Sequence, residues 1–278
     1  MKTRFAPSPT GPLHLGHAYS ACLAASLAQE AEGRFLLRIE NIDQGRARPE
    51  WEAQIYDDLT WLGLDWPRPV MHQSARMAAY EAALRTLWQA GLLYPCTCQR
   101  RDILEAASAP QDGAPAMGPD GVVYPGTCRD KPKPTEMPSG TALRLDMRRA
   151  AQGTVLFEER GLEKSGTIHV TPDQMIHQIG DIVLARRDMG TSYHLAVTVD
   201  DAAQGITDVV RGVDLFEATA IHVLLQRLLG LATPRYHHHA LIRDDSGKRL
   251  AKRDDARAIA TYRDAGLSAK DVKALVGL

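Results

Sequence analysis

The sequence predicts an α/β fold: a Rossmann-like parallel sheet with an inserted subdomain and a short C-terminal helical region. Two observations indicate this fold. Short apolar runs alternate with stretches of helical spacing over the first 93 residues, and a strand pattern returns after residue 173. Such alternation is typical of parallel strands joined by right-handed helical crossovers. At 278 residues, with 44% hydrophobic and 24% charged residues, the chain can bury one substantial core.

The first half of the sheet is predicted from prolines, glycines and helical spacing. Prolines end the first apolar run, and alanines at helical intervals follow Gly16. Gly33 stands where a helix C-cap is expected, and Pro49 suits a first helical turn. The expected elements are a strand at 4–6, a helix from Gly16 to Gly33, a strand at 35–40, and helices from Pro49 to Gly63 and from Ser74 to about Gly91.

An insertion is expected where prolines and glycines crowd residues 110–138 and strand-like runs lack helical partners. The predicted strands are 141–147 and 154–159 in the insertion, 182–185, 193–199 and 206–210 in the second half of the core, and 236–242 after it. Asp214 with Glu217 predicts a capping box for a helix that ends at Gly230, and short helices finish the chain. The predicted division is a catalytic core at 1–93 and 173–232, an insertion at 94–172, and a loop with C-terminal helices at 233–278.

Net charge and the length of apolar runs limit where the protein is expected to work and what it is expected to bind. The net charge is −1 and the pI is about 6.8, so any RNA contact is expected to be a local patch. No signal-peptide core follows the first residues, and no apolar run reaches the roughly 18 to 20 residues of a membrane span. We therefore expect a cytoplasmic monomer without membrane contact.

The segment His14-Leu15-Gly16-His17 lies where the first strand is expected to turn into the first helix. Backbone N–H groups and the helix dipole make such a turn an anion site, so a phosphate is expected there. Gly16 lets a ligand approach the backbone, and both imidazoles can donate hydrogen bonds to phosphate oxygens. These four residues alone equally allow a helix start with two unrelated surface histidines.

A glycine-led basic run, Gly247-Lys248-Arg249-Leu250-Ala251-Lys252-Arg253, follows a predicted strand and turn. Lys252 can reach a triphosphate, and its flexible ammonium can follow the charge as pyrophosphate leaves. Most basic runs are only solvated surface, so the meaning of this one depends on the histidine segment. The triplet His237-His238-His239 falls on a predicted strand whose alternation sends neighbours to opposite faces, which favours a structural or RNA-facing role over metal binding.

Several segments together resemble glutamyl-tRNA synthetases. The opening of that family is matched by Arg4-Phe5-Ala6-Pro7-Ser8-Pro9-Thr10-Gly11, by the histidine segment, and by Leu37-Arg38-Ile39-Glu40-Asn41-Ile42-Asp43. Its later core is matched, in order, by Tyr193-His194-Leu195-Ala196-Val197-Thr198-Val199-Asp200-Asp201, Gly205-Ile206-Thr207 and Val210-Arg211-Gly212. The resemblance covers about residues 3–95 and 173–255, and it implies an enzyme that activates glutamate with ATP.

The resemblance also implies roles for individual residues. The ATP-binding residues are His14, Gly16, His17, Arg249 and Lys252, of which His14, His17 and Lys252 are catalytic. The glutamate-binding residues are Arg4, Ala6, Ser8, Glu40, Tyr193 and Arg211. A doubly acidic amino acid with one ammonium needs guanidinium and carboxylate partners, which this set contains. The basic run departs from the family's KMSKS-type loop, because Arg249 replaces the first lysine and Ala251 the serine.

The implied reaction is in-line attack of the glutamate α-carboxylate on the α-phosphorus of ATP, with Mg²⁺ on the triphosphate. It yields glutamyl-adenylate and pyrophosphate without a covalent enzyme intermediate. Positioning and charge stabilisation would supply the catalysis.

Three of the four cysteines, Cys96, Cys98 and Cys128, cluster in the predicted insertion, which fits metal ligation better than a disulfide framework. A structural zinc ion takes four ligands, and from the residues alone Tyr124, His169 and water all remain candidates for the fourth. Three reduced thiols without metal are the plain alternative. The Cys-x-Cys, Tyr-x-x-x-Cys arrangement resembles the zinc site of glutamyl-queuosine tRNA(Asp) synthetases, which implies Tyr124 and one structural Zn²⁺ per chain.

The same family resemblance implies the acceptor. After Lys252 only 26 residues follow, too few for the helical anticodon-binding region of glutamyl-tRNA synthetases. The expected partners are therefore L-glutamate, ATP and tRNA(Asp) bearing queuosine, with activation of glutamate independent of tRNA. Two other readings are a minimal glutamyl-tRNA synthetase that charges a tRNA 3′ end, and a non-catalytic RNA-binding paralogue.

Overall fold

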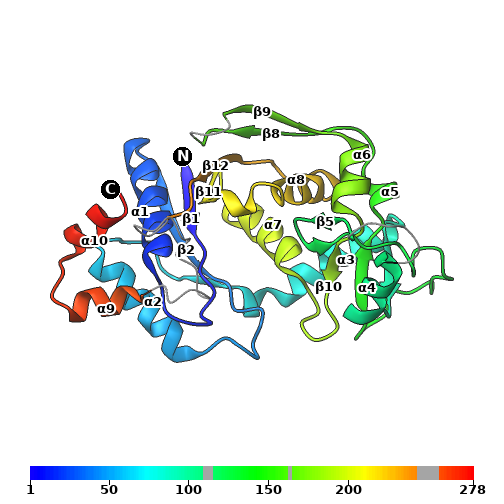
Figure 1. The fold of residues 1–278 in the computed structure, drawn as a ribbon, viewed down its shortest axis with the longest axis horizontal. Helices are drawn as coiled ribbons and strands as arrows, with labels where there is room; N and C mark the ends of the chain where they lie inside the picture. Colours follow the sequence, from blue (N-terminus) through cyan, green and yellow to red (C-terminus); the bar gives the residue numbers. More distant parts are fainter. Residues whose placement is uncertain (109–114, 162–164, 243–256) are drawn as a thin grey trace.

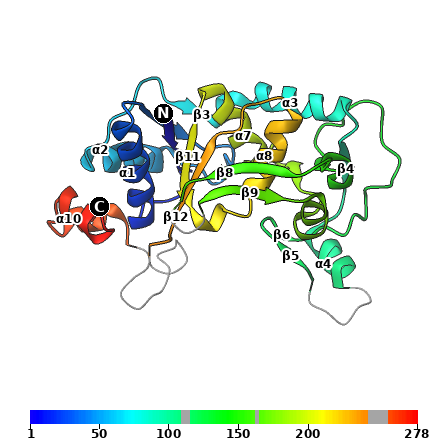
Figure 2. The same ribbon diagram turned by 90° about the horizontal axis from the view of Figure 1, so that it is seen from above.

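The computed structural model describes residues 1–108, 115–161, 165–242 and 257–278 (Figure 1). The protein is elongated, and the C-terminal helices lie at the same end as the first helix (Figures 1 and 2). Strand β4 (Leu93–Cys96) and helix α4 (Arg100–Ser108) lie toward the other end.

A parallel three-stranded sheet opens the chain, in the order β1-β2-β3. Its strands are β1 (Lys2–Phe5), β2 (Arg34–Ile39) and β3 (Met71–His72), and its connecting helices are α1 (Leu15–Glu30) and α2 (Pro49–Trp61). The buried face of α1 contains Ala18, Ala21, Ala24 and Ala28, whose small side chains allow close packing on the sheet. A side chain at Gly33 would collide with the carbonyl of Met1, so only glycine lets the chain enter β2 here.

The second half of the core adds parallel strands on the other side of β1. Here β11 (Asp208–Gly212) pairs with β12 (Arg235–His239), which pairs with β8 (Val155–Glu159), while β9 (Gly166–Val170) runs antiparallel to β8. The start of β11 meets β1 through the Thr207 N–H, which donates to the Lys2 carbonyl at 3.0 Å. The predicted α/β fold class with a parallel sheet is confirmed.

Residues 193–199, predicted as a strand, are instead the first part of helix α7 (Tyr193–Gln204). The helix is buried on several sides, including His194, Leu195, Ala196 and Val197 in succession. A helix covered all round carries a continuous apolar run, which periodicity alone does not distinguish from a buried strand.

The predicted capping box is also wrong. Val213–Leu215 forms a separate 3-10 turn, and α8 (Thr219–Leu228) begins after Ala218 without a side-chain cap. The acidic pair therefore precedes the helix instead of capping it, because the chain makes an extra turn as it leaves β11.

The far end of the molecule holds an antiparallel sheet in the order β10-β7-β4. It consists of β4 (Leu93–Cys96), β7 (Ala142–Leu145) and β10 (Val183–Ala185), with the hairpin β5 (Met117–Gly118) and β6 (Gly121–Val122) nearby. The remaining elements there are α4 (Arg100–Ser108), α5 (Met147–Ala150), α6 (Pro172–Gln174) and the π-helix Met175–Ile179. Strands pair across the predicted boundaries, since β8 joins the core sheet and β10 joins β7, so the residue limits of the domains stay a prediction.

Among the described residues, two large apolar clusters and one small one make up the core. The N-terminal cluster packs α1 and α2 against the first sheet, and the C-terminal helices α9 (Ile259–Asp264) and α10 (Ala269–Leu275) contribute Ile259 and Val272 to it. The second cluster joins α3 (Met77–Gln89), α7 and α8 to the strands around them. The predicted helical C-terminal region is thus confirmed. In the described ranges, no helix combines the length and apolarity that crossing a bilayer requires.

Candidate active site and metal centre

The histidine segment forms the N-terminal cap of α1. The Nδ1 of His14 accepts from the Gly16 N–H at 3.1 Å, and the Nδ1 of His17 accepts from the His14 N–H at 3.1 Å. In each neutral ring the proton therefore sits on Nε2, where it can be donated. The two ring centroids are 3.8 Å apart. This pairing holds both imidazoles at the positive end of the helix dipole.

A cavity of about 260 Å³ lies at the carboxyl ends of β1 and β11, where the strand order reverses. This is the usual ligand site of open α/β sheets. Its lining includes the predicted residues Arg4, Ala6, His14, Gly16, His17, Glu40, Tyr193 and Arg211. Predicted residues far apart in the sequence thus share one cavity.

A second cavity of about 480 Å³ adjoins the first, and Glu40 and Tyr193 line both. The predicted residue Ser8 lines this second cavity, together with Asp120 from the β5–β6 turn. The other two predicted residues, Arg249 and Lys252, lie outside the described residues.

Buried ion pairs hold the charged floor of the first cavity. Arg4 donates to both carboxylate oxygens of Asp201 at 2.9 and 3.2 Å, and Arg38 donates to Asp201 at 2.8 Å and to Glu40 at 3.2 Å. Burial opposes ionisation of Asp201, but the two guanidinium groups outweigh it and keep its pKa below the usual value. At Glu40 burial dominates over Arg38 and Arg4, and the pKa is raised.

Arg38 and Asp201 were not predicted as site residues. Arg38 is on β2, two positions before Glu40, which directly follows the strand. Continued alternation of the extended chain places both side chains on one face of the sheet, and this signal was available in the sequence. Asp201 lies 197 residues from its partner Arg4, a pairing that no local pattern contains.

Arg211 is 6% exposed, and its guanidinium is surrounded by hydrogen-bond acceptors. These are the rings of His222 and His238, the hydroxyl of Thr219 and the carbonyl of Leu215. The middle member of the histidine triplet is therefore a partner of the cavity arginine. The outer two have other partners: His237 meets Asp208 at 2.9 Å, and His239, which also lines the first cavity, meets Ser20 at 2.6 Å.

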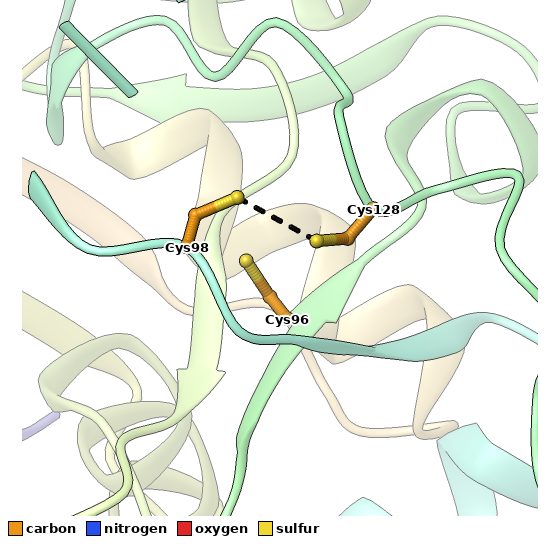
Figure 3. A group of neighbouring side chains, drawn as sticks. All are labelled: Cys96, Cys98 and Cys128. Carbon is orange, nitrogen blue, oxygen red and sulfur yellow. Dashed lines mark hydrogen bonds between the residues drawn. The ribbon is translucent and has the colours of Figure 1, made fainter. Parts of the chain in front are cut away.

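The cysteine cluster forms a compact group at the far end of the molecule. The sulfur atoms of Cys96, Cys98 and Cys128 lie within 4.8 Å of one another, and Figure 3 shows them turned toward a common point. The hydroxyl of Tyr124 is 3.4 Å from Cys96 Sγ and 3.3 Å from Cys98 Sγ, and the two sulfurs of Cys98 and Cys128 are 3.5 Å apart. Ligand atoms around a tetrahedral zinc ion stand about 3.5 to 3.8 Å apart. The donor set and its spacing therefore fit zinc.

Arg144 supplies positive charge beside this group. Its Nε–H donates to Cys96 Sγ at 3.3 Å, and its guanidinium lies 3.8 Å from the centre of the Tyr124 ring. A site with three thiolates carries net negative charge even around Zn²⁺, and a buried guanidinium offsets it. His169, the other protein side chain considered as a ligand, is on the exposed side of β9, away from the three sulfurs.

Comparison with known proteins places the chain in a family. Residues 1–275 match the family model described as tRNA synthetases class I (E and Q), catalytic domain. Curated relatives include the glutamyl-Q tRNA(Asp) synthetase of Rhodobacter capsulatus, 63% identical over 280 residues and covering both chains completely. Another, that of Nocardia farcinica, is 43% identical over 98% of this chain and 82% of its own length.

Solved structures support the same fold. A glutamate tRNA ligase from Elizabethkingia meningosepticum superposes with a TM-score of 0.78 at 24% identity, over 100% of this chain and 60% of that one. The chain thus spans about three fifths of the length of this ligase. From the curated relatives and the family model together, the chain belongs to the glutamyl-Q tRNA(Asp) synthetases, within the class I (E and Q) tRNA synthetase catalytic-domain family.

Proposed function

We propose that this chain activates L-glutamate with ATP, without tRNA in that step, and transfers the glutamyl group to queuosine in the anticodon of tRNA(Asp). The observation that carries the proposal is the first cavity, whose lining combines two arginines and one glutamate with the N-terminus of α1. Its lining offers Arg4 and Arg211 for carboxylates and Glu40 for an ammonium, which is the charge pattern of an amino acid.

In the activation step, an oxygen of the glutamate α-carboxylate attacks the α-phosphorus of ATP. A carboxylate–phosphorus bond forms, and the bond to the β-phosphate oxygen breaks to release pyrophosphate. His14 and His17 donate hydrogen bonds to phosphate oxygens from Nε2, and the N-terminus of α1 stabilises the growing charge. Mg²⁺ enters with ATP and neutralises part of the triphosphate charge.

Lys252 is proposed to follow the leaving pyrophosphate, with Arg249 as an auxiliary cation. Because its charge acts mainly in the transition state, Lys252→Met should lower kcat of glutamate-dependent ATP–pyrophosphate exchange by about a hundredfold or more. The glutamate KM should stay near that of the unchanged protein. Lys248→Met, in the same basic run, is the control and should exchange normally. Equal losses in the two variants would remove Lys252 from the mechanism.

In the transfer step, a hydroxyl oxygen of queuosine attacks the acyl carbon of glutamyl-adenylate, and AMP leaves with the bonding electrons. The hydroxyl proton passes to solvent or to the departing phosphate. The second cavity supports this step, because it shares Glu40 and Tyr193 with the first and gives an acceptor a route to the same acyl group.

The acceptor is tested with two tRNA(Asp) preparations that differ only in queuosine. Labelled glutamate should accumulate on the tRNA that contains queuosine and stay at background on the tRNA that lacks it. Exchange of pyrophosphate should proceed equally without either tRNA. Acceptance by both preparations, or a requirement for tRNA in the exchange, would contradict the proposal.

A structural Zn²⁺ is proposed on Cys96, Cys98, Cys128 and Tyr124. When bound, the ion crosslinks the segments that carry these residues, and the adenylation needs no metal-activated water. Support comes from the spacing of the sulfur and phenol oxygen atoms and from the adjacent Arg144 cation.

A further inference from the structure

Four hydrogen bonds fix the guanidinium of Arg211. Its Nε donates to His238 Nε2 at 3.0 Å, and its Nη1 donates to His222 Nδ1 at 3.0 Å. Its Nη2 donates to the Thr219 hydroxyl at 2.7 Å and to the Leu215 carbonyl at 3.2 Å. A guanidinium has five N–H groups, so within the described part of the chain one N–H of Nη1 is left for a ligand in the cavity.

These contacts dictate the protonation of both histidines. Arginine only donates hydrogen bonds, so the ring nitrogens that face Arg211 must be acceptors and carry no proton. His222 is therefore neutral with its proton on Nε2, and His238 is neutral with its proton on Nδ1. The two rings hold opposite tautomers around one cation.

Each tautomer is fixed a second time on the far side of its ring. The Nε2–H of His222 points to Nδ1 of His194 at 3.0 Å, and Nε2 of His194 is 3.4 Å from the Asp120 carboxylate. The Nδ1–H of His238 points to Glu159 at 2.5 Å. Each donor thus meets an acceptor in both hydrogen-bond chains that start at Arg211, the one through His222 and the one through His238.

Burial makes this arrangement costly to change. His222 and His238 are 2% and 5% exposed, and Glu159 is 1% exposed. Burial, reinforced by the neighbouring Arg211 charge, lowers the pKa of His222 well below its usual value, and burial likewise lowers the pKa of His238. Burial opposes ionisation of Glu159, but the bonds from the His238 ring and backbone N–H keep its pKa low. An ionised carboxylate therefore stands one imidazole away from the guanidinium.

We propose that His222 and His238 are positioning residues, whose neutral rings in opposite tautomers orient Arg211 so that its remaining N–H meets a carboxylate oxygen of the amino-acid substrate. The inference rests on the proposed function for the identity of that substrate. Neither histidine contacts the substrate; each acts through Arg211. The expected consequence is confined to glutamate binding and leaves the ATP side of the cavity unchanged.

The test compares two substitutions at one position. His222→Leu removes the acceptor, whereas His222→Asn places an amide oxygen close to the position of Nδ1. In glutamate-dependent pyrophosphate exchange, the leucine variant should raise the glutamate KM about tenfold or more, as expected for a lost hydrogen bond to a charged group. The ATP KM and kcat should stay within about threefold, and the asparagine variant should restore most of the glutamate affinity.

His169→Leu serves as the matched control, because it makes the same substitution on the exposed side of β9. An unchanged glutamate KM in His222→Leu, or equal impairment of the leucine and asparagine variants, would overturn the inference. An unmodified protein that shows no glutamate-dependent exchange would instead refute the proposed function.

A measurement on the unmodified protein keeps the inference testable if the leucine variant fails to fold. With ¹⁵N-labelled histidine, NMR reports which ring nitrogen is protonated, and His222→Asn and His238→Gln identify the signals. At pH 7.5 the expected result is a neutral Nε2–H ring for His222 and a neutral Nδ1–H ring for His238. The same tautomer in both rings, or an imidazolium in either, would contradict it.

Discussion

The two carboxylates at the floor of the first cavity differ in how well the protein neutralises them. Asp201 accepts three hydrogen bonds from Arg4 and Arg38, whereas Glu40 accepts one from Arg38 at 3.2 Å. Burial accordingly raises the pKa of Glu40 while that of Asp201 stays low. Glu40 is therefore the carboxylate that gains most when a cation such as a substrate ammonium arrives.

Replacing Glu40 by glutamine should weaken glutamate binding by about 2 kcal/mol or more, roughly 30-fold in KM, because the ammonium loses its charged partner. The pH dependence follows from the raised pKa of Glu40. Glutamate binding should be full above that pKa and should weaken as the pH falls through it. Exchange kinetics measured from neutral pH downward should show this acid limb in the unchanged protein but not in Glu40→Gln. A retained limb in the variant would assign it to another group.

Asp58 on α2 carries a buried carboxylate away from the cavity. It is fully buried, neither oxygen has a hydrogen-bond partner among the described residues, and Arg263 approaches only to 3.8 Å. Burial raises its pKa to about 6, so the folded state favours the protonated form. Its contribution to stability is fully present below the unfolded pKa near 4 and is lost as the pH rises through about 6.

Asp58→Asn should therefore stabilise the protein at neutral and alkaline pH. The expected gain in the free energy of unfolding at pH 8 is about 1 to 2 kcal/mol, below the roughly 3 kcal/mol that the pKa shift corresponds to, because the amide is also buried without partners. The gain should disappear near pH 4. Urea unfolding at the two pH values measures it, and a destabilised variant at pH 8 would show that Asp58 has a stabilising partner.

Among the helices and strands, those bounded by local sequence signals were predictable from sequence. The helices α1, α2 and α3 and strands β1 and β2 carry local signals, namely apolar spacing on one face and glycine or proline at the ends. Helix α7 lacked such a signal because it is buried on several sides. The pairing of β8 with β12 joins Glu159 to Tyr236 across 77 positions, a contact set by the whole fold.

The residues of the candidate site also divide into those with a local sequence signal and those without one. The residues of the opening motifs were predicted together because they are close in sequence and share a recognisable pattern. The histidines around Arg211, apart from the triplet member, come from α7 and α8 and had no sequence signal that separated them from core residues. Their significance depends on donor and acceptor geometry, which only the assembled fold provides.

The proposed zinc site at the far end of the molecule leads to a prediction about the stability of that end. Cys98→Ser should reduce bound zinc from one ion per chain to a substoichiometric amount and lower the unfolding temperature, because the ion ties β4 to the segment that carries Tyr124 and Cys128. Metal analysis of protein purified without chelator measures the first effect and calorimetry the second. Cys22→Ser is the control for bound zinc, since this buried cysteine of α1 is remote from the cluster.

The variant Tyr124→Phe tests the contribution of the phenol oxygen to zinc binding separately from that of the three thiolates. Loss of one ligand should weaken zinc binding by about tenfold or more while leaving three thiolates in place. Competition with a chelator compares the variant with the unchanged protein. Equal zinc affinity in the two proteins would indicate a different fourth ligand.

At the scale of the whole molecule, the fold places two adjoining cavities next to each other. The parallel sheet brings the histidine cap, the charged floor and Arg211 into one cavity, and the β5–β6 turn brings Asp120 to a second cavity that shares Glu40 and Tyr193. In the proposed mechanism, activation takes place in the first cavity and the acceptor approaches through the second. The identity of the acceptor is thus the claim that distinguishes this chain from an enzyme that charges a tRNA 3′ end.

The most direct test is to locate the transferred glutamate on tRNA(Asp). Queuosine-containing tRNA is incubated with the protein, ATP and labelled glutamate, then cut with a ribonuclease, and a second sample is prepared from tRNA without its 3′-terminal adenosine. We expect label on the anticodon fragment and undiminished acceptance by the shortened tRNA. Label on the 3′-terminal fragment, lost when the terminal adenosine is removed, would contradict it.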